Sequence, residues 1–124
     1  MRGEVAALGA LCLAAAPALA VETTDFEVRT TADLVTLCSA EPGDPLYAEA
    51  MQFCYGYMAG GAHFHQAMVH EDQIRAIACP REQVTRQDLV AMFLDWAKVN
   101  PQHMGELPVE SVMRAAVATW PCER

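Results

Sequence analysis

The chain has 124 residues, with 16 acidic and 8 basic side chains, and its formal net charge is −8 at neutral pH. This length fits a single domain with one hydrophobic core. No basic cluster occurs, which argues against nucleic acids and anionic membrane surfaces as partners. An acidic exterior keeps a protein soluble, and it also favours encounter with a basic protein partner.

The first twenty residues have the pattern of a secretory signal peptide. Arg2 supplies a positive charge, residues 5–21 contain no charged side chain, and Ala18-Leu19-Ala20 is a small-x-small cleavage motif. We therefore expect residues 1–20 to be a cleaved signal peptide and residues 21–124 to be a single domain in the periplasm. An uncleaved membrane anchor is the alternative, although the uncharged stretch is shorter than most spanning helices. After cleavage, no membrane attachment is expected.

Four cysteines follow the predicted signal peptide: Cys38, Cys54, Cys79 and Cys122. An even number in an exported domain indicates two disulfides. Structural zinc is the competing interpretation, but zinc ligands usually come in pairs two to four residues apart, and these cysteines are widely separated. The sequence therefore favours disulfides, with no cofactor and no metal ion.

Hydrophobic spacing and capping residues predict four helices and no regular strand. The first helix starts at Thr30 or Thr31 and ends near Cys38. The second starts at Asp44-Pro45, because a capping carboxylate precedes a proline at the first helical position. Its expected apolar stripe consists of Leu46, Ala50, Phe53, Cys54, Tyr57, Gly61, Phe64 and Met68.

Two further helices complete an expected all-α fold, a small bundle of four main helices. Thr85 can form a capping box with Asp88 at the start of the third helix, which ends at Asn100-Pro101. The fourth has Pro108 at its first position and stops before Pro121. The expected buried face of the third helix is Leu89, Phe93, Trp96 and Ala97. That of the fourth is Val109, Val112, Met113, Ala116, Val117 and Trp120.

The order of the helices selects the disulfide pairing. The connection between the third and fourth helices is short, so these helices should pack antiparallel, with the start of one beside the end of the other. Cys79 precedes the third helix and Cys122 follows the fourth. We therefore predict Cys79–Cys122, which leaves Cys38 at the end of the first helix to pair with Cys54 on the second.

Several segments together resemble the Rap/Tai family of periplasmic immunity proteins, which act against type VI secreted peptidoglycan amidases. The resemblance covers about residues 30–122. It is carried by Leu37-Cys38, Phe53-Cys54-Tyr55-Gly56-Tyr57-Met58-Ala59-Gly60-Gly61, Cys79-Pro80 with Val84-Thr85, Asn100-Pro101 and Trp120-Pro121-Cys122. It implies a protein that binds and blocks an amidase toxin without chemistry of its own. A periplasmic stress or chaperone-like helical protein is the alternative, although such chaperones typically keep one disulfide.

Candidate contacts with a toxin are Tyr55, His63 and Glu71, because they should lie off the buried stripe of the second helix. Tyrosine is a frequent anchor of protein interfaces. Two glycines of the same helix, Gly56 and Gly60, each cost about 1 kcal/mol of helix propensity relative to alanine. Close approach of another helix would offset this cost. We expect that helix to come from the same chain, with contact across a homodimer as the alternative.

The histidines and hydroxyl groups do not predict an enzyme. His63 and His70 are two helical turns apart, too far to share a metal ion without a third element, and His65 points elsewhere. With all four cysteines oxidised, no thiol is left to act as a nucleophile. Ser39 and Ser111 have no recognisable catalytic partners, so binding is the expected activity.

Overall fold

The computed structural model describes residue 9 and residues 19–123. Within this part the chain forms four α-helices and two short 3-10 helices, without a strand, so the predicted all-α bundle is confirmed. The elements are η1 (Thr23–Glu27), α1 (Thr31–Cys38), α2 (Tyr47–His70), α3 (Arg86–Lys98), η2 (Pro101–His103) and α4 (Pro108–Thr119). None of these helices combines the length and apolar composition needed to span a bilayer. The predicted signal peptide falls almost wholly outside the described residues.

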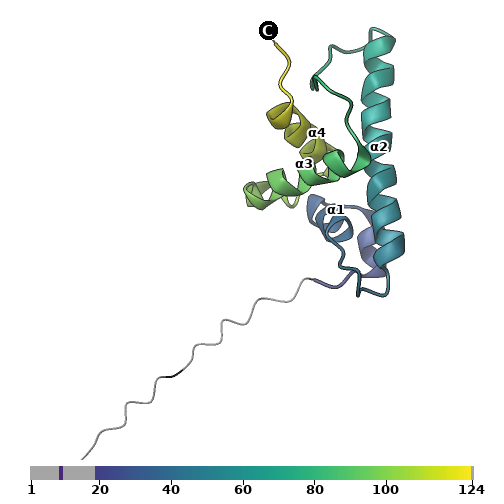
Figure 1. The fold of residues 1–124 in the computed structure, drawn as a ribbon, viewed down its shortest axis with the longest axis vertical. Helices are drawn as coiled ribbons and strands as arrows, with labels where there is room; N and C mark the ends of the chain where they lie inside the picture. Colours follow the sequence, from purple (N-terminus) through teal and green to yellow (C-terminus); the bar gives the residue numbers. More distant parts are fainter. Residues whose placement is uncertain (1–8, 10–18, 124) are drawn as a thin grey trace, which may run out of the picture.

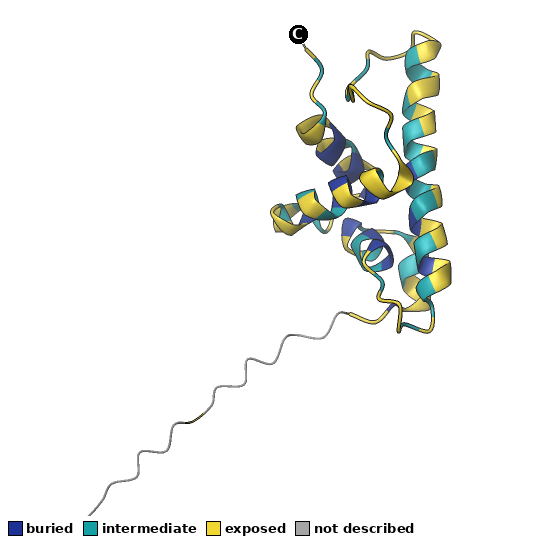
Figure 2. Cartoon of the chain, viewed as in Figure 1, coloured by how far each residue is buried: buried dark blue, intermediate teal, exposed yellow. Residues whose placement is uncertain are grey.

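The long helix α2 forms one side of the molecule, and α1, α3 and α4 lie together on its other side (Figure 1). The three shorter helices reach only part of the length of α2. Beyond them, the connection formed by residues 71–85 returns from the far end of α2 to the start of α3. Buried residues lie where the helices face one another, and exposed residues follow the outer side of α2 (Figure 2).

The main core receives side chains from all four α-helices. Leu34 of α1, Met58 of α2 and Phe93 of α3 are fully buried, together with Ala115 of α4. A second, smaller cluster joins Val21, Leu37 and Ala50, with Phe26, Val28, Ala40 and Leu46 packed against it. The segment before α1 is therefore part of the fold from Val21 onwards.

Three of the predicted helix starts are observed, and one is wrong. Thr30 caps α1 by accepting the Asp33 N–H at 3.3 Å. The Thr85 hydroxyl accepts the Asp88 N–H at 3.1 Å, and Asp88 accepts the Thr85 N–H at 2.8 Å, so the capping box is confirmed. Pro108 occupies the first turn of α4 as predicted. In contrast, α2 begins at Tyr47 rather than at Asp44-Pro45. The Asp44 carboxylate binds the N–H groups of Val21 and Leu46 instead, both at 2.8 Å, so it holds a turn ahead of the helix.

The predicted stripe of α2 is partly wrong. The buried residues are Ala50, Cys54 and Met58, whereas Phe53 is 36% exposed and Phe64 is 68% exposed. Towards its C-terminal end, α2 extends past α1, α3 and α4, so less of the chain is available to cover its last turns (Figure 1).

The expected face of α4 is also rotated. Val109 and Val117 are more than 40% exposed, while Ser111 and Ala115 are fully buried. The buried Thr31 hydroxyl donates to the Ser111 hydroxyl at 2.8 Å. Because this bond keeps Ser111 on the inner face of α4, the two valines face outward.

Both disulfides have the predicted pairing. Cys38 at the end of α1 is joined to Cys54 on α2, and Cys79 before α3 is joined to Cys122 after α4. The first links elements 16 positions apart and the second elements 43 positions apart. In the chain-entropy model such loops stabilise a fold by about 3 and 4 kcal/mol respectively.

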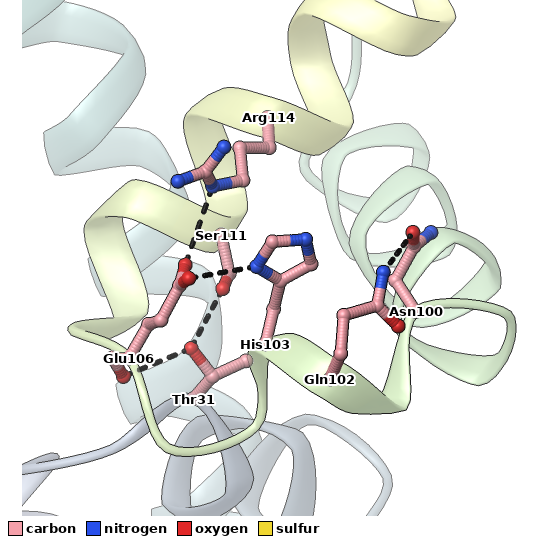
Figure 3. A network of polar contacts seen from close by, with 7 residues as sticks. All are labelled: Thr31, Asn100, Gln102, His103, Glu106, Ser111 and Arg114. Atoms are coloured by element: carbon pink, nitrogen blue, oxygen red, sulfur yellow. Dashed lines mark hydrogen bonds and ion pairs between the residues drawn. The ribbon is translucent and has the colours of Figure 1, made fainter.

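A polar network joins α1 to the connection between α3 and α4 (Figure 3). The first two helical N–H groups of α1, at Thr31 and Ala32, donate to the carbonyl oxygens of Glu106 and Met104 at 2.8 and 3.0 Å. The Thr31 hydroxyl contacts both the Glu106 carbonyl, at 3.1 Å, and the Ser111 hydroxyl. The start of α1, which would otherwise have unpaired donors, is thus completed by residues more than 70 positions away.

Around this joint, Glu106 also organises the surface. Its carboxylate accepts from Arg114 at 3.2 Å and pairs with the His103 ring at 2.8 Å, while His103 stacks on Trp96. The hydrogen bond from His103, with the charge of Arg114, holds the pKa of Glu106 below its usual value. The α3–α4 connection is therefore anchored on both α3 and α4.

The buried hydroxyl pair can be tested by a double-mutant cycle. Thr31→Val should lower the free energy of unfolding by about 1–3 kcal/mol, because it leaves the Ser111 hydroxyl buried without a partner. Adding Ser111→Ala should recover part of that loss, since no polar group is then left unpaired. Chemical denaturation of the four proteins measures both effects. Strictly additive losses would show that the two hydroxyls do not interact.

Candidate functional site

A groove with a volume of about 900 Å³ indents the described surface. It lies between the second half of α2, the connection 71–85 and the α3–α4 pair. We call it the α2–α4 groove. Its floor is apolar and includes the buried residues Met58, Met92, Val112 and Ala116. Its exposed rim carries the polar residues His63, Gln66, His70, Glu82, Gln83 and Arg86.

The outer wall of the groove is residues 76–80, and three links hold it in place. The Ile77 N–H donates to Nε2 of His65 on α2 at 3.1 Å. The Cys79 N–H donates to the Trp120 carbonyl at the end of α4 at 2.8 Å. The Cys79–Cys122 disulfide fixes the same point covalently. An extended segment without regular structure of its own is thereby held open against two helices.

His65 supports the wall of the groove, a role that the sequence does not predict. Its ring accepts the Ile77 N–H at 3.1 Å. An accepting Nε2 requires the neutral ring, with the proton on Nδ1. Nothing in the sequence near His65 signals this contact, because its partner lies 12 positions further along the chain in an irregular segment.

The three predicted toxin contacts do not form one cluster. His63 is exposed on the rim of the α2–α4 groove. Glu71 is exposed at the end of α2, directly after His70 of the rim. Tyr55 lies two turns earlier on α2, is half-buried and packs against the main core. The structure thus spreads the three residues along α2, each about two turns from the next, with only Tyr55 packed against the core.

A second surface runs along the outer side of α2. Residues Phe53, Gly56, Gly60 and Phe64 follow one another at helical spacing, and we call this surface the α2 face. A Cβ added to Gly56 or Gly60 would meet no other atom within 4 Å. The expectation that another helix of the same chain approaches these glycines is therefore wrong, because the bundle packs against the opposite side of α2.

Tyr57 borders the α2 face and shows how far burial extends. Its ring stacks on Phe53, and burial raises the pKa of its hydroxyl above the usual value, opposed by the nearby backbone of Val109. Phe53 in turn meets Phe26 of η1 edge-on. These aromatic contacts partly cover the α2 face near Phe53, whereas Phe64, further along the helix, is exposed.

Across residues 19–123, His, Cys, Asp and Glu side chains do not gather in a group of three suited to a metal ion. The four cysteines of this region are all in disulfides. The features that the geometry offers are an apolar groove with a polar rim and an exposed apolar helix face. Both are suited to contact with another protein.

Comparison with models of known families matches residues 30–122 to the Rap1a immunity proteins. The chain belongs to this family. The match spans both disulfides, all four α-helices and every residue of the groove. Comparisons with curated proteins and with solved structures give no match. Membership of the Rap1a family indicates an immunity function, that is, binding of a toxin effector. The two disulfides are consistent with an exported protein.

The role of the second disulfide in shaping the groove gives a prediction. Replacing both Cys79 and Cys122 with alanine should cost about 2–5 kcal/mol of stability and should release the wall of the groove. Amide hydrogen exchange of Ile77 and Cys79, whose N–H groups are bonded in the wall, should rise under native conditions, while α1 and α2 stay protected.

The matched control is the variant in which Cys38 and Cys54 are both replaced with alanine. It should be destabilised by a comparable amount, with its faster exchange at α1 instead of at residues 76–80. Equal exchange at positions 77 and 79 in the two variants would contradict the assignment of Cys79–Cys122 as the support of the wall.

Proposed function

We propose that this protein is exported to the periplasm and protects the cell by binding a peptidoglycan amidase effector delivered by type VI secretion. The observation that carries the proposal is the family match over residues 30–122. The resemblance of the Cys54-Tyr55-Gly56 segment and the terminal Trp120-Pro121-Cys122 to the amidase-directed members supports the choice of toxin. The protein acts by occupying the toxin, with no chemistry of its own.

The α2–α4 groove supports a binding role. Its apolar floor and polar rim resemble the organisation of protein interfaces, where a dry centre is surrounded by hydrophilic contacts. Ile77, which is partly exposed and apolar, extends the contact area along the wall of the groove. A toxin segment with an apolar side chain at its tip fits such a groove, with the rim residues bonding to its flanks.

The charge of the protein supports the same partner. A net charge of −8 favours a toxin with a basic contact face. Glu71 and Asp72 at the exposed end of α2 place two carboxylates next to the rim of the groove. Long-range attraction then speeds encounter, and it weakens as salt screens it.

Among the predicted contacts, we assign His63 to the rim and Glu71 to the charged end of the interface. We retain Tyr55 as a more distant contact, through the part of its ring that remains accessible. Its half-buried position makes it an anchor with little conformational freedom to lose.

Binding can be measured by calorimetry with an amidase encoded beside this gene. The expected dissociation constant is about 1 nM or lower, equivalent to about −12 kcal/mol, because antagonism of a toxin requires nearly complete occupancy. Both proteins should be recovered intact. The association rate should fall as the salt concentration rises.

Single substitutions locate the interface. His63→Ala and Glu71→Ala should each weaken binding by about tenfold or more, which corresponds to at least about 1.4 kcal/mol. Glu49→Ala is the matched control, since Glu49 is an exposed acid at the opposite end of α2. The same loss for Glu49 and Glu71 would place the toxin elsewhere, and failure of every encoded amidase to bind would exclude the proposed partner.

We further propose that the protein forms a homodimer through the α2 face. The helix-propensity cost of Gly56 and Gly60 is not offset within the chain, because both residues face solvent. Close approach of a second copy of α2 would offset it, and the exposed Phe64 ring would be covered in the same contact.

The substitution Gly60→Leu tests this interface. In a dimer the added side chain should separate the two helices, so sedimentation should show a monomer where the native protein is a dimer. The free energy of unfolding of the monomer should rise by up to about 1 kcal/mol, because leucine is the better helix former and meets no neighbour. An unchanged sedimentation coefficient for the variant would exclude the α2 face as the interface.

A further inference from the structure

The boundary of the folded domain falls between Ala20 and Val21. Leu19 is 83% exposed and Ala20 is also exposed, whereas Val21 is only 7% exposed. The Val21 side chain packs with Leu37 and Ala50 in the smaller cluster. The chain thus changes from exposed to buried between two consecutive residues, Ala20 and Val21.

The backbone nitrogen of Val21 has a charged partner. Its N–H donates to Oδ2 of Asp44 at 2.8 Å, across 23 positions of sequence. The other carboxylate oxygen, Oδ1, accepts the Leu46 N–H at 2.8 Å. These two bonds hold the pKa of Asp44 below its usual value, so the carboxylate is ionised at neutral pH. No lysine, arginine or histidine of residues 19–123 forms an ion pair with Asp44.

The same peptide bond is the one that the signal-peptide motif predicts to be cut. Hydrolysis adds the hydroxyl of a water molecule to the Ala20 carbonyl carbon and a proton to the Val21 nitrogen, as the C–N bond between them breaks. The new amine has an ordinary pKa near 8, so it takes up a further proton and becomes a cation at neutral pH.

We propose that Asp44 is a built-in binding site for the α-ammonium group of Val21, so that signal-peptide removal adds an ion pair to the fold. This inference rests on the proposed export. A neutral N–H donor becomes a cationic donor at the same place, and a hydrogen bond to an ionised carboxylate is strengthened when its donor is charged. Burial of the Val21 side chain holds the nitrogen at the carboxylate, which lowers the entropic cost that ordinary surface pairs carry.

The ion pair would tie the mature N-terminus to the start of α2. Asp44 orders the turn that leads into α2 through Leu46, and α2 is bound to α1 by the Cys38–Cys54 disulfide. The N-terminal segment, which contributes Val21 and Phe26 to the smaller cluster, is then fixed at both ends. An N-terminal extension keeps the neutral hydrogen bond and loses the charge.

The experiment compares two N-termini in two backgrounds. Protein exported with its own signal should have an intact mass that corresponds to a chain starting at Val21. A second form, exported through a signal cut two residues earlier, retains Leu19-Ala20. The form that starts at Val21 should unfold at a temperature roughly 2–6 °C higher, and the difference should shrink in 1 M salt.

The substitution Asp44→Asn should abolish the difference between the two N-termini, because the partner charge is gone. Asp25→Asn is the matched control: its carboxylate accepts the Glu22 N–H at 2.8 Å, whereas the Val21 N–H bonds to Asp44, so the difference should persist. A start other than Val21, equal stability of the two forms, or a difference that survives Asp44→Asn would each overturn the proposal. None of these readouts involves a toxin, so they are independent of the immunity function.

Discussion

The disulfide between Cys79 and Cys122 holds the returning connection of the chain against the end of α4, and the candidate site depends on this constraint. The long helix α2 extends beyond the core, and the connection after it has no regular structure to keep it in place. A covalent link, a backbone bond to Trp120 and the ring of His65 supply what secondary structure does not. The α2–α4 groove exists because this segment is held away from the helices without collapsing onto them.

The rest of the fold serves to place α2. The Cys38–Cys54 disulfide fixes its first half to α1, and α1 is fixed to the α3–α4 connection by the buried pair of Thr31 and Ser111. The helices α1, α2 and α4 are each thereby connected to a neighbour by at least one specific polar or covalent contact in addition to apolar packing. Such specificity suits a binding protein, whose contact surface must be formed before its partner arrives.

Local signals in the sequence were sufficient to predict that four helices form and how the cysteines pair. The capping box of Thr85 and Asp88 and the proline at position 108 act within one helical turn, so they could be identified without the fold. The disulfide pairing followed from the antiparallel order of α3 and α4, which a short connection imposes.

Features that depend on distant partners could not be predicted in this way. Asp44 looked like a helix cap, but Val21 and Leu46 take up its carboxylate and delay the helix. The glycines of α2 looked like points of close packing, yet the bundle covers the other side of the helix. The role of His65 depends on an irregular segment whose path no periodicity encodes. The groove itself could not be predicted either. Of the three predicted contacts, the structure places His63 on its rim.

The central claim is that this member of the Rap1a family neutralises a toxin that neighbouring cells deliver to the periplasm. Competition between a strain that lacks this gene and its otherwise identical parent tests it most directly. The account predicts that the deletion strain is killed by the parent, and that a parent unable to secrete effectors no longer kills it. Equal growth of the two strains, with secretion active and the neighbouring amidase produced, would contradict it.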